Sequence, residues 1–492
     1  MNFGRILFGW MLTSLCFLSG GAWAQVVTEF SLFPTFVSPS GITAGPDGNL
    51  WFTDQSVSRI GRITPLGVVT VFEAGITAGA VPFDITTGPD GNLWFTEYNG
   101  NRIGRITPSG VVTEFSAGIS AFAYPWGIAA GPDGNLWFTE SQGANRIGRI
   151  TPLGVVTEFS AGISAGAQPI GITAGPDGNL WFTEASGNRI GRITPLGVVT
   201  EFSAGITAGA VPVDITTGPD GNLWFTEELG NQIGRITPLG VVTEFSAGIT
   251  NDARPRHITP GPDGNLWFTE LRDRIGRITP LGVITEFSAG ITPSALPLGI
   301  TAGPDGDLWF AEASGSRIGR ITPPAPPPVL VVEYHHAGFD HYFITPVATE
   351  IALLDAHTPP YQEWSRTGYS FNVYAPGTAP AGSVAICRFF NDHYAPKSSH
   401  FYAPHGLGCE ATLAQFPDWK LEDDKLFNAM LPDATNGTCP SATIPVYRLY
   451  NNGMGNAPNH RFVTSLTERQ NMISKGYVAE GYGIGVGMCV PH

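Results

Sequence analysis

Two kinds of residue in the first two thirds of the chain could do chemistry: one histidine and a set of acids at equivalent places. His257 is the only histidine before residue 324, and a lone histidine is more often structural than catalytic. An acid ends the short motif L-W-F-[TA]-[ED] in seven copies, at Asp54, Glu97, Glu140, Glu184, Glu227, Glu270 and Glu312. Seven equivalent carboxylates could bind a cation. The arginines of the following R-I-G-R-I motif offer partners, so we favour ion pairs between repeats.

A second group of candidates is found where the repeats differ. A proline, two variable residues and an isoleucine precede each L-W-F motif, and the variable pairs include Phe83-Asp84, Trp126-Gly127, Val213-Asp214 and Arg256-His257. Function in repeat proteins is concentrated in variable loops. An aromatic wall with a few polar groups is typical of a small-molecule site. We therefore take as ligand-binding candidates Phe83, Asp84, Trp126, Asp214 and Arg256.

A fold must position these residues, and the sequence repeat indicates which fold it is. The string G-P-D-G-[ND]-L-W-F begins at Gly45, Gly88, Gly131, Gly175, Gly218, Gly261 and Gly303, a period of 42 to 44 residues. Each repeat carries four short β-branched or aromatic segments separated by Gly, Pro and Asn, in the second copy 84–87, 92–97, 102–107 and 111–115. Four strands in about 43 residues predict one blade of a β-propeller, so the fold class is all-β with seven blades.

The outermost strand indicates how the ring closes. The string V-[VI]-T-[EV]-F also occurs seven times, but its first copy, 26–30, precedes the first G-P-D-G and none follows the seventh blade. The N-terminal strand should therefore complete the last blade, which removes two exposed sheet edges.

The repeat closely resembles the virginiamycin B lyase (streptogramin lyase) family over residues 26–323, through P-x-G-I-T-x-G-P-D-G-x-L-W-F-T-E and N-R-I-G-R-I-T-x-x-G-x-[VI]-T-E-F. The resemblance implies a seven-bladed propeller. It also implies a Mg²⁺-dependent elimination, in which a base removes the α-proton beside the ester of a cyclic depsipeptide and the threonine Cβ–O bond breaks.

The catalytic positions implied by the resemblance are altered in this chain. The family has two histidines, each just after the proline of a P-H-[AG]-I stretch, and these positions hold Arg256 and Leu298. His257 is displaced by one residue, which on a strand turns a side chain to the other face. Leu296 replaces a family glutamate, and Glu312 stands one residue early. If the chain is a lyase, the catalytic candidates are His257, Glu270 and Glu312.

The N-terminus predicts export. Arg5, an apolar run and Ala22-Trp23-Ala24 form a secretory signal, so the mature chain should begin at Gln25, secreted or periplasmic. Cys16 lies inside the apolar run without a good lipoprotein motif, so we do not expect a lipid anchor. The net charge of −15 argues against nucleic acid as a partner. No later segment is apolar for long enough to span a membrane, and we expect a monomer.

A different domain follows the propeller. We expect domains at 1–24 (signal peptide), 25–323 (propeller), 324–328 (proline-rich linker) and 329–492. The last part repeats His341-Tyr342-Phe343, His400-Phe401-Tyr402 and His460-Arg461-Phe462, which predicts a smaller β-rich, pseudo-threefold domain, with a trefoil-like arrangement as one form. Its histidines could bind metal or line sugar pockets but are more simply structural. Trp364 and Trp419 would suit stacking on sugars if they are exposed, and a place in the core is the equal alternative.

Four cysteines remain after export, all in this last part. Sequential pairing, Cys387–Cys409 and Cys439–Cys489, is the simplest of the three possible connectivities, and a zinc site is the alternative.

Three functions follow from these observations. The first is a secreted ligand-binding or interaction protein that takes a small molecule, peptide or glycan at the propeller mouth, with no cofactor certain and the metal unknown. The second is a Mg²⁺-dependent carbon–oxygen lyase that linearises streptogramin B-type depsipeptides. The third is a cell-envelope scaffold. The absence of both family histidines favours the first and third.

Overall fold

The structure is a computed structural model of the chain. It describes residues 27–32, 38–142, 145–324, 328–359, 361–375, 383–391, 399–404, 409, 413–415, 417–440, 443–453 and 458–491. The expected signal peptide and residues 325–327 of the expected linker lie outside these ranges.

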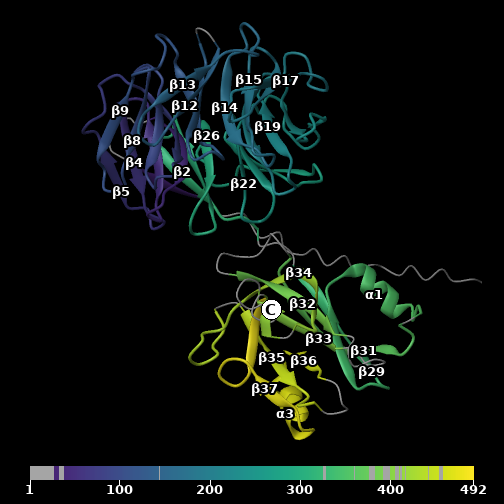
Figure 1. Cartoon of the computed structure of the whole chain (residues 1–492). Helices are drawn as coiled ribbons and strands as arrows, with labels where there is room; N and C mark the ends of the chain where they lie inside the picture. The colour runs from purple at the N-terminus through teal and green to yellow at the C-terminus, as the bar shows by residue number, and fades with distance from the viewer. Residues whose placement is uncertain are drawn as a thin grey trace, which may run out of the picture.

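Seven four-stranded antiparallel sheets form a closed ring, as the repeat predicts (Figure 1). The innermost strands are β2 (Pro39–Ala44), β6 (Pro82–Thr87), β10 (Pro125–Ala130), β14 (Pro169–Ala174), β18 (Pro212–Thr217), β22 (Pro255–Pro260) and β26 (Pro297–Ala302). Each of them packs against the innermost strands of both neighbouring sheets, and β26 packs against β2. These seven strands therefore surround one axis.

The other strands follow outward in three layers. The second strands are β3 (Leu50–Asp54), β7 (Leu93–Glu97), β11 (Leu136–Glu140), β15 (Leu180–Glu184), β19 (Leu223–Glu227), β23 (Leu266–Glu270) and β27 (Leu308–Glu312). The third strands are β4 (Arg59–Ile63), β8 (Arg102–Ile106), β12 (Arg146–Ile150), β16 (Arg189–Ile193), β20 (Gln232–Ile236), β24 (Arg274–Ile278) and β28 (Arg317–Ile321). The outermost strands are β5 (Val69–Phe72), β9 (Val112–Phe115), β13 (Val156–Phe159), β17 (Val199–Phe202), β21 (Val242–Phe245), β25 (Ile284–Phe287) and β1 (Val27–Ser31).

The turn of each G-P-D-G-N-x-W motif fixes a buried tryptophan. In the first blade Gly48 has a φ of +74°, which glycine adopts without steric cost. The Asp47 carboxylate accepts hydrogen bonds from the Trp51 indole N–H (3.0 Å) and from the Asn49 side chain (2.8 Å). The same Asp–Trp bond recurs in every blade. The motif is therefore both a hairpin turn and an anchor for the core.

The core lies between neighbouring blades, and an arginine extends it to the next blade. Trp94 has no exposed surface, and its ring stacks on Phe115 with centroids 5.4 Å apart. The Arg105 guanidinium lies over both rings and donates to the Pro152 carbonyl of the next blade (3.0 Å). Buried aromatic rings of this kind contribute on the order of 2–3 kcal/mol each through burial.

The expected closure by the N-terminal strand is confirmed. Strand β1 pairs antiparallel with β28, Val27 opposite Ile321 and Ser31 opposite Arg317. Phe30 stacks on Trp309 with centroids 5.3 Å apart, as the outer phenylalanine does in the other blades. The Glu29 carboxylate accepts two hydrogen bonds of 2.6 Å from the backbone N–H and the hydroxyl of Thr292. The first strand of the propeller thus completes its last blade.

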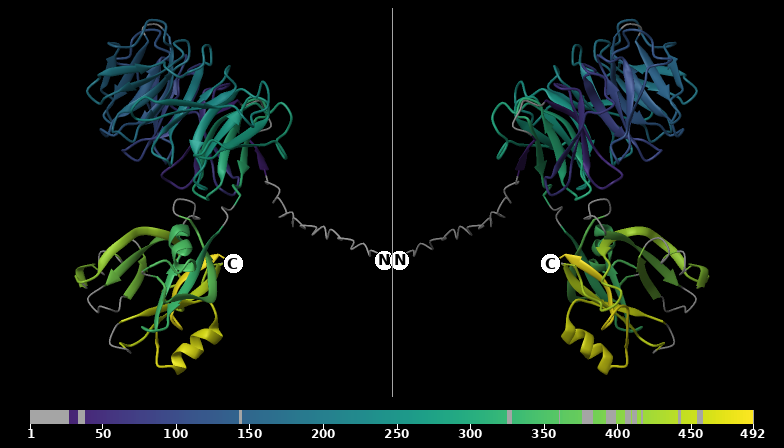
Figure 2. Two further views of the ribbon diagram at one scale, coloured as in Figure 1. Left: turned by 90° about the vertical axis from the view of Figure 1, so that its right-hand side faces the viewer. Right: turned by 90° about the vertical axis from the view of Figure 1, so that its left-hand side faces the viewer.

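The C-terminal part is β-rich, as expected (Figure 2). Each of its three repeated units contains one antiparallel hairpin. The hairpins are β29 (Val329–His336) with β30 (His341–Thr345), β32 (Ser383–Asn391) with β33 (Ser399–Pro404), and β35 (Thr443–Tyr450) with β36 (His460–Val463). The remaining elements are β31 (Trp364–Val373), β34 (Lys420–Met430), β37 (Val478–Glu480), β38 (Val486–Pro491), α1 (Ala348–Asp355) and α3 (Leu466–Ser474).

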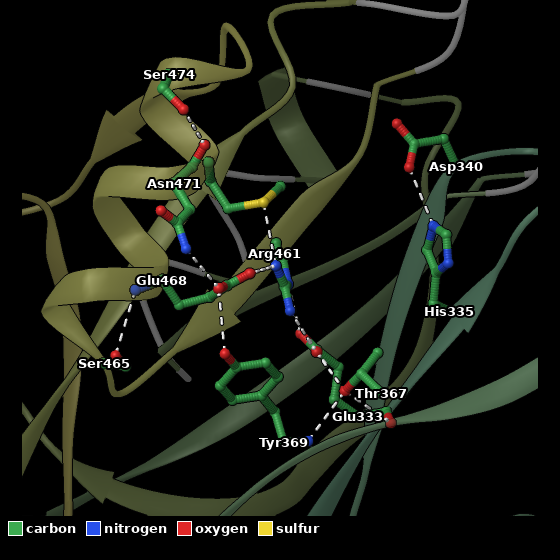
Figure 3. A network of polar contacts seen from close by, with 11 residues as sticks. Glu333, His335, Asp340, Thr367, Tyr369, Arg461, Ser465, Glu468, Asn471 and Ser474 are labelled. Carbon is green, nitrogen blue, oxygen red and sulfur yellow. Dashed lines mark hydrogen bonds and ion pairs between the residues drawn. The ribbon is translucent and has the colours of Figure 1, made fainter.

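A buried ion-pair network joins the first and third units (Figure 3). The Arg461 guanidinium, only 3% exposed, contacts the Glu333 carboxylate at 2.9 Å and also pairs with Glu468. Glu468 in turn accepts a hydrogen bond from the Tyr369 hydroxyl (3.1 Å). Because the buried guanidinium is paired with two carboxylates, its burial is tolerated.

The structure pairs the cysteines sequentially. Cys387 is bonded to Cys409 and Cys439 to Cys489, with Cα atoms 6.5 and 5.6 Å apart. Within the described residues, no helix is long and apolar enough to cross a membrane.

Candidate functional site

A β-bulge in every innermost strand holds the two variable residues. In β6, Pro82 pairs with Glu97 and Ile85 with Phe95, so the register shifts across Phe83 and Asp84. The same shift recurs in the six other blades. Bulges redirect side chains and are common beside active sites. Here the bulge separates the two variable positions into two layers around the axis.

A buried threonine ties each bulge to the next blade. The Thr96 hydroxyl accepts from the Asp84 backbone N–H (3.1 Å) and donates to the Trp126 carbonyl (2.7 Å). Equivalent bonds to the next blade come from Thr53, Thr139, Thr183, Thr226 and Thr269. In the seventh blade Ala311 takes this place. This hydrogen bond therefore links six of the seven blades to the next one at the level of the variable residues.

The residue before the proline of the innermost strand has an uncommon backbone conformation in six of the seven blades. Val81 and Val211 have φ values of +56° and +58°, and the same left-handed region holds Tyr124, Gln168, Arg254 and Leu296. Positive φ is costly for a β-branched residue and is often retained at functional sites. An asparagine of the preceding blade secures the conformation in several repeats, as where Asn188 Oδ1 accepts from the Val211 N–H (3.1 Å).

The first variable residues form the outer layer of the mouth. The rings of Phe83 and Trp126 lie with centroids 4.1 Å apart, and Trp126 packs against the cluster of Ile170 and Val213. From the opposite side of the ring, the Arg256 guanidinium reaches to 5.7 Å from the Trp126 ring centroid. This layer is an aromatic and aliphatic surface with one cationic group.

The second variable residues form another ring around the axis, in which four of seven positions are glycine. Gly41 and Gly171 approach the next blade so closely that an added Cβ would lie 2.9 and 2.8 Å from the Cα atoms of Asp84 and Asp214. The other ionisable member is His257, whose Nδ1 lies 3.4 Å from Asp214 Oδ2. The structure thus brings three of the candidate residues together at the axis.

Each aspartate of this ring is also bonded to the next blade. Asp84 Oδ2 accepts from the Ile128 N–H (3.0 Å), and Asp214 Oδ2 accepts from the Ile258 N–H (2.9 Å). Removal from water raises the pKa of Asp84 to about 6. The Asp214 carboxylate raises this pKa further, whereas the Ile128 N–H and the His257 imidazole lower it. Asp84 therefore titrates near neutral pH in the floor of the mouth.

Arg256 and His257 point to different places, as expected for neighbours on a strand. Arg256 Nη1 is 2.7 Å from Glu228 Oε2, and the arginine lies in the outer layer with Trp126. His257 lies in the axial ring with Asp214, and its side chain is 17% exposed. The position that the resemblance assigns to a family histidine therefore holds an arginine that is already paired with a carboxylate.

Glu270 and Glu312 are not brought together with His257. Both side chains are fully buried, and no hydrogen bond or ion pair recorded for the described residues joins either to His257. Burial, with the nearby carboxylates of Glu286 and Glu29, raises the pKa of each to about 8. Both carboxyl groups are enclosed within their blades and do not face the mouth.

The expectation that these acids pair with arginines between blades needs a correction. Glu97 lies opposite Arg102 in the same sheet, with Oε2 and Nη1 3.9 Å apart. The link between blades comes from the second arginine of R-I-G-R-I, and it goes to a carbonyl. The acid pairs with an arginine of its own sheet, because the end of the L-W-F-T-E strand lies opposite the start of the R-I-G-R-I strand.

Sequence reasoning missed part of the mouth. Tyr98 lies next to Phe83 and Trp126, with centroids 6.3 and 5.4 Å away, and Glu228 holds Arg256. Both residues directly follow the L-W-F-T-E motif in their repeats. Comparison of that position among the seven copies is the signal that could have identified them.

The metal implied by the family resemblance finds no obvious protein site. Among the residues that the structure describes, no group of three or more His, Cys, Asp or Glu side chains could hold a metal ion. One oxygen of each axial carboxylate, Oδ2 of Asp84 and Oδ2 of Asp214, already accepts a backbone N–H group. The mouth therefore does not fit a metal held by these side chains.

Comparison with known proteins supports the assignment of the repeat. A model of the virginiamycin B lyase family matches residues 22–248 and 204–326. A streptogramin B lyase structure is 39% identical, with a TM-score of 0.57, and the match covers 61% of this chain and 97% of that one. Virginiamycin B lyase from Staphylococcus aureus is 40% identical, covers 61% of this chain and 100% of its own, and has a TM-score of 0.57.

A catalytically inactive variant of the Staphylococcus aureus enzyme with quinupristin matches equally, at 41% identity and a TM-score of 0.57, covering 61% of this chain and 100% of its own. No curated protein matches the chain.

Proposed function

This chain belongs to the virginiamycin B lyase family, and on that premise we propose that its propeller is a ligand-binding module whose site is the mouth. The ligand class is an amphipathic small molecule or peptide that lies against Trp126 and Phe83. The observation that carries this proposal is the outer layer itself. Arg256 lies at the position of a family histidine and is held by Glu228 and Trp126. A paired arginine cannot act as the base of an elimination.

The proposal is tested with quinupristin, the compound present with a family member of known structure. We expect binding by isothermal titration calorimetry without conversion in the presence of Mg²⁺. Elimination leaves the mass unchanged, so liquid chromatography with fragmentation mass spectrometry is the readout. Trp126→Ala should weaken binding at least about tenfold, which corresponds to roughly 1.4 kcal/mol. Leu153→Ala, at a turn residue that is 90% exposed, is the matched control and should bind normally.

Formation of a linear dehydrobutyrine product with turnover would contradict the binding function and favour the lyase. That second function has one supporting observation in the structure, since the His257 imidazole is held by the Asp214 carboxylate at 3.4 Å. A carboxylate that orients an imidazole is a common arrangement of a general base. His257→Ala would then abolish turnover, whereas a binding protein loses affinity at most.

We further propose that the protein works outside the cytoplasm. The two disulfides support this location, because such bonds persist in oxidising compartments. N-terminal sequencing of the protein recovered from periplasm or medium should begin at Gln25, and recovery of uncleaved chain from the cytoplasm alone would contradict export.

A further inference from the structure

The C-terminal part contains a cavity that the propeller function does not use. Its volume is about 400 Å³, within the range of roughly 300–1,000 Å³ that is typical of small-molecule sites. The wall comes from the first repeated unit, with His336, Phe343 and Trp364, and from the second, with Arg388, His400 and Glu422. The cavity therefore lies where two units meet.

One side of the cavity is a layer of flat rings. The His336 imidazole stacks on Phe339 with centroids 4.0 Å apart and an interplanar angle of 4°. The partly buried Trp364 ring meets His336 edge-on at 5.2 Å and Phe343 at 6.0 Å. Tyr361, 36% exposed, stands at the same cavity. Rings fixed by one another in this way offer a rigid apolar surface at low entropic cost.

The other side is polar, with one arginine placed between two carboxylates. The Arg388 guanidinium, 9% exposed, binds Glu350 through two hydrogen bonds of 2.7 and 2.9 Å and lies 2.9 Å from Glu422 Oε2. His400 Nε2 lies 3.4 Å from the same Glu422 oxygen. Both carboxylates remain about 30% exposed. Burial raises the pKa of Glu350, but its hydrogen bonds and ion pair with Arg388 oppose this effect, and the pKa is lowered overall. The Glu350 carboxylate is therefore a hydrogen-bond acceptor at neutral pH.

This charge arrangement disfavours ionic ligands. One arginine faces two carboxylates, so an anion would meet uncompensated negative charge. The Arg388 guanidinium lies 5.4 Å from the Phe343 ring centroid and so takes the place that a ligand cation would need on that ring. A neutral ligand with several hydroxyl donors and an apolar face meets neither obstacle.

The polar half of the site occurs twice in the domain. Around Phe401, Trp419 lies at 6.1 Å, His460 at 5.0 Å and the Arg448 guanidinium at 5.4 Å. Glu480 contacts both Arg448 (3.4 Å) and His460 (3.2 Å), as Glu422 contacts Arg388 and His400. The Arg–Glu–His group is thus a feature of the repeat, and the first unit adds to it the stacked layer of His336 and Phe339.

We propose that this cavity binds one pyranose ring of a neutral saccharide. The apolar face of the sugar lies on Trp364, and its hydroxyl groups donate to the exposed oxygens of Glu422 and Glu350. Stacking on a flat indole with hydrogen bonds to ionised carboxylates uses both halves of the wall at once. The site belongs to the C-terminal part, so it is independent of the ligand at the propeller mouth.

The test uses the full-length protein and the methyl glycosides of glucose, galactose, mannose and N-acetylglucosamine. Saturation-transfer difference NMR detects binding, and isothermal titration calorimetry measures it at millimolar glycoside. At least one glycoside should bind. Trp364→Ala should weaken it about tenfold or more, and Trp364→Phe, which keeps a flat ring, should retain most of the affinity.

The second cluster provides the matched control, since Trp419→Ala removes the same residue type from the related Arg–Glu–His group and should leave the affinity unchanged. Thermal melting of each variant shows whether the domain is folded. Absence of binding by every glycoside overturns the proposal, as does undiminished binding by Trp364→Ala. Trp364-dependent binding of tetramethylammonium or inorganic phosphate without glycoside binding would also overturn it and assign an ionic ligand.

Discussion

At the scale of single residues, the position of an acid in its strand decides whether it can act at the mouth. Glu270 and Asp84 both lie in the repeated part of the propeller, yet Glu270 is sealed inside its blade and Asp84 faces the axis. Burial raises the pKa of both, to about 8 and about 6. Only Asp84 combines a raised pKa with a place beside other polar groups of the mouth.

The raised pKa of Asp84 predicts a pH-dependent stability. A carboxyl group whose folded pKa exceeds its unfolded value stabilises the fold most at low pH, and this contribution is lost as the pH rises through the folded value. Asp84→Asn should therefore raise the melting temperature of the propeller more at about pH 7.5 than at about pH 4. Differential scanning calorimetry at both pH values measures this change. An equal shift at the two pH values would show that Asp84 has an ordinary pKa.

Much of the residue-level site could be predicted from sequence because the seven copies act as an internal alignment. Phe83, Trp126 and Arg256 do meet in one layer, and Asp84, Asp214 and His257 in another. The contact of Trp126 with Arg256 could not be predicted, because the two lie on different blades and their distance depends on the width of the ring. The burial of Glu270 and Glu312 could not be predicted either, because the motif indicates their position in the strand but not which residues pack over their side chains.

At the scale of elements, each blade depends on a glycine in its third strand. An added Cβ at Gly191 would lie 2.1 Å from the Phe182 ring of the neighbouring strand, far inside van der Waals contact. The glycine of the R-I-G-R-I motif is therefore needed for packing, because it leaves space for the phenylalanine ring of L-W-F. The strands themselves could be predicted, because turn residues and β-branched segments alternate with a fixed period, whereas this contact across strands could not.

This packing predicts the effect of a small substitution. Gly191→Ala should lower the free energy of unfolding by about 1–3 kcal/mol, the usual cost of overpacking a core. Phe182→Leu in the same chain should recover part of that loss, because it removes the ring that the new methyl group would meet. Denaturant unfolding of the two single variants and the double variant gives the coupling. Strictly additive losses would contradict direct contact as the cause.

At the scale of the whole molecule, one strand from the start of the chain holds the ring together. Strand β1 contributes the pairing with β28, the stack of Phe30 on Trp309 and the bonds of Glu29 to Thr292. Sequence alone predicted this closure, because the outer-strand motif is offset by one position from the others. The C-terminal part was less predictable, because its three units are faint and its sheets combine strands from more than one unit.

The closure can be tested with a matched pair of variants. Phe30→Ala and Phe202→Ala remove equivalent rings, stacked on Trp309 and Trp181 at 5.3 and 5.4 Å. Each should cost about 2 kcal/mol or more of stability. Only Phe30→Ala should make the N-terminal strand accessible, so limited proteolysis should cut that variant near residue 30 under native conditions. Equal cleavage of both variants near residue 30 would contradict a special role of β1 in closure.

The offset of the outer strand also determines when the ring can close during biosynthesis. The first strand of the propeller to be synthesised stays unpaired until the last hairpin of the last blade exists, because among the described strands β1 pairs with β28 alone. During that interval the nascent chain carries an unprotected β-edge at each end, the kind of surface on which growing chains aggregate. A chain that ends before β28 therefore has an open arc of blades rather than a closed ring, because β1 then lacks the strand with which it pairs.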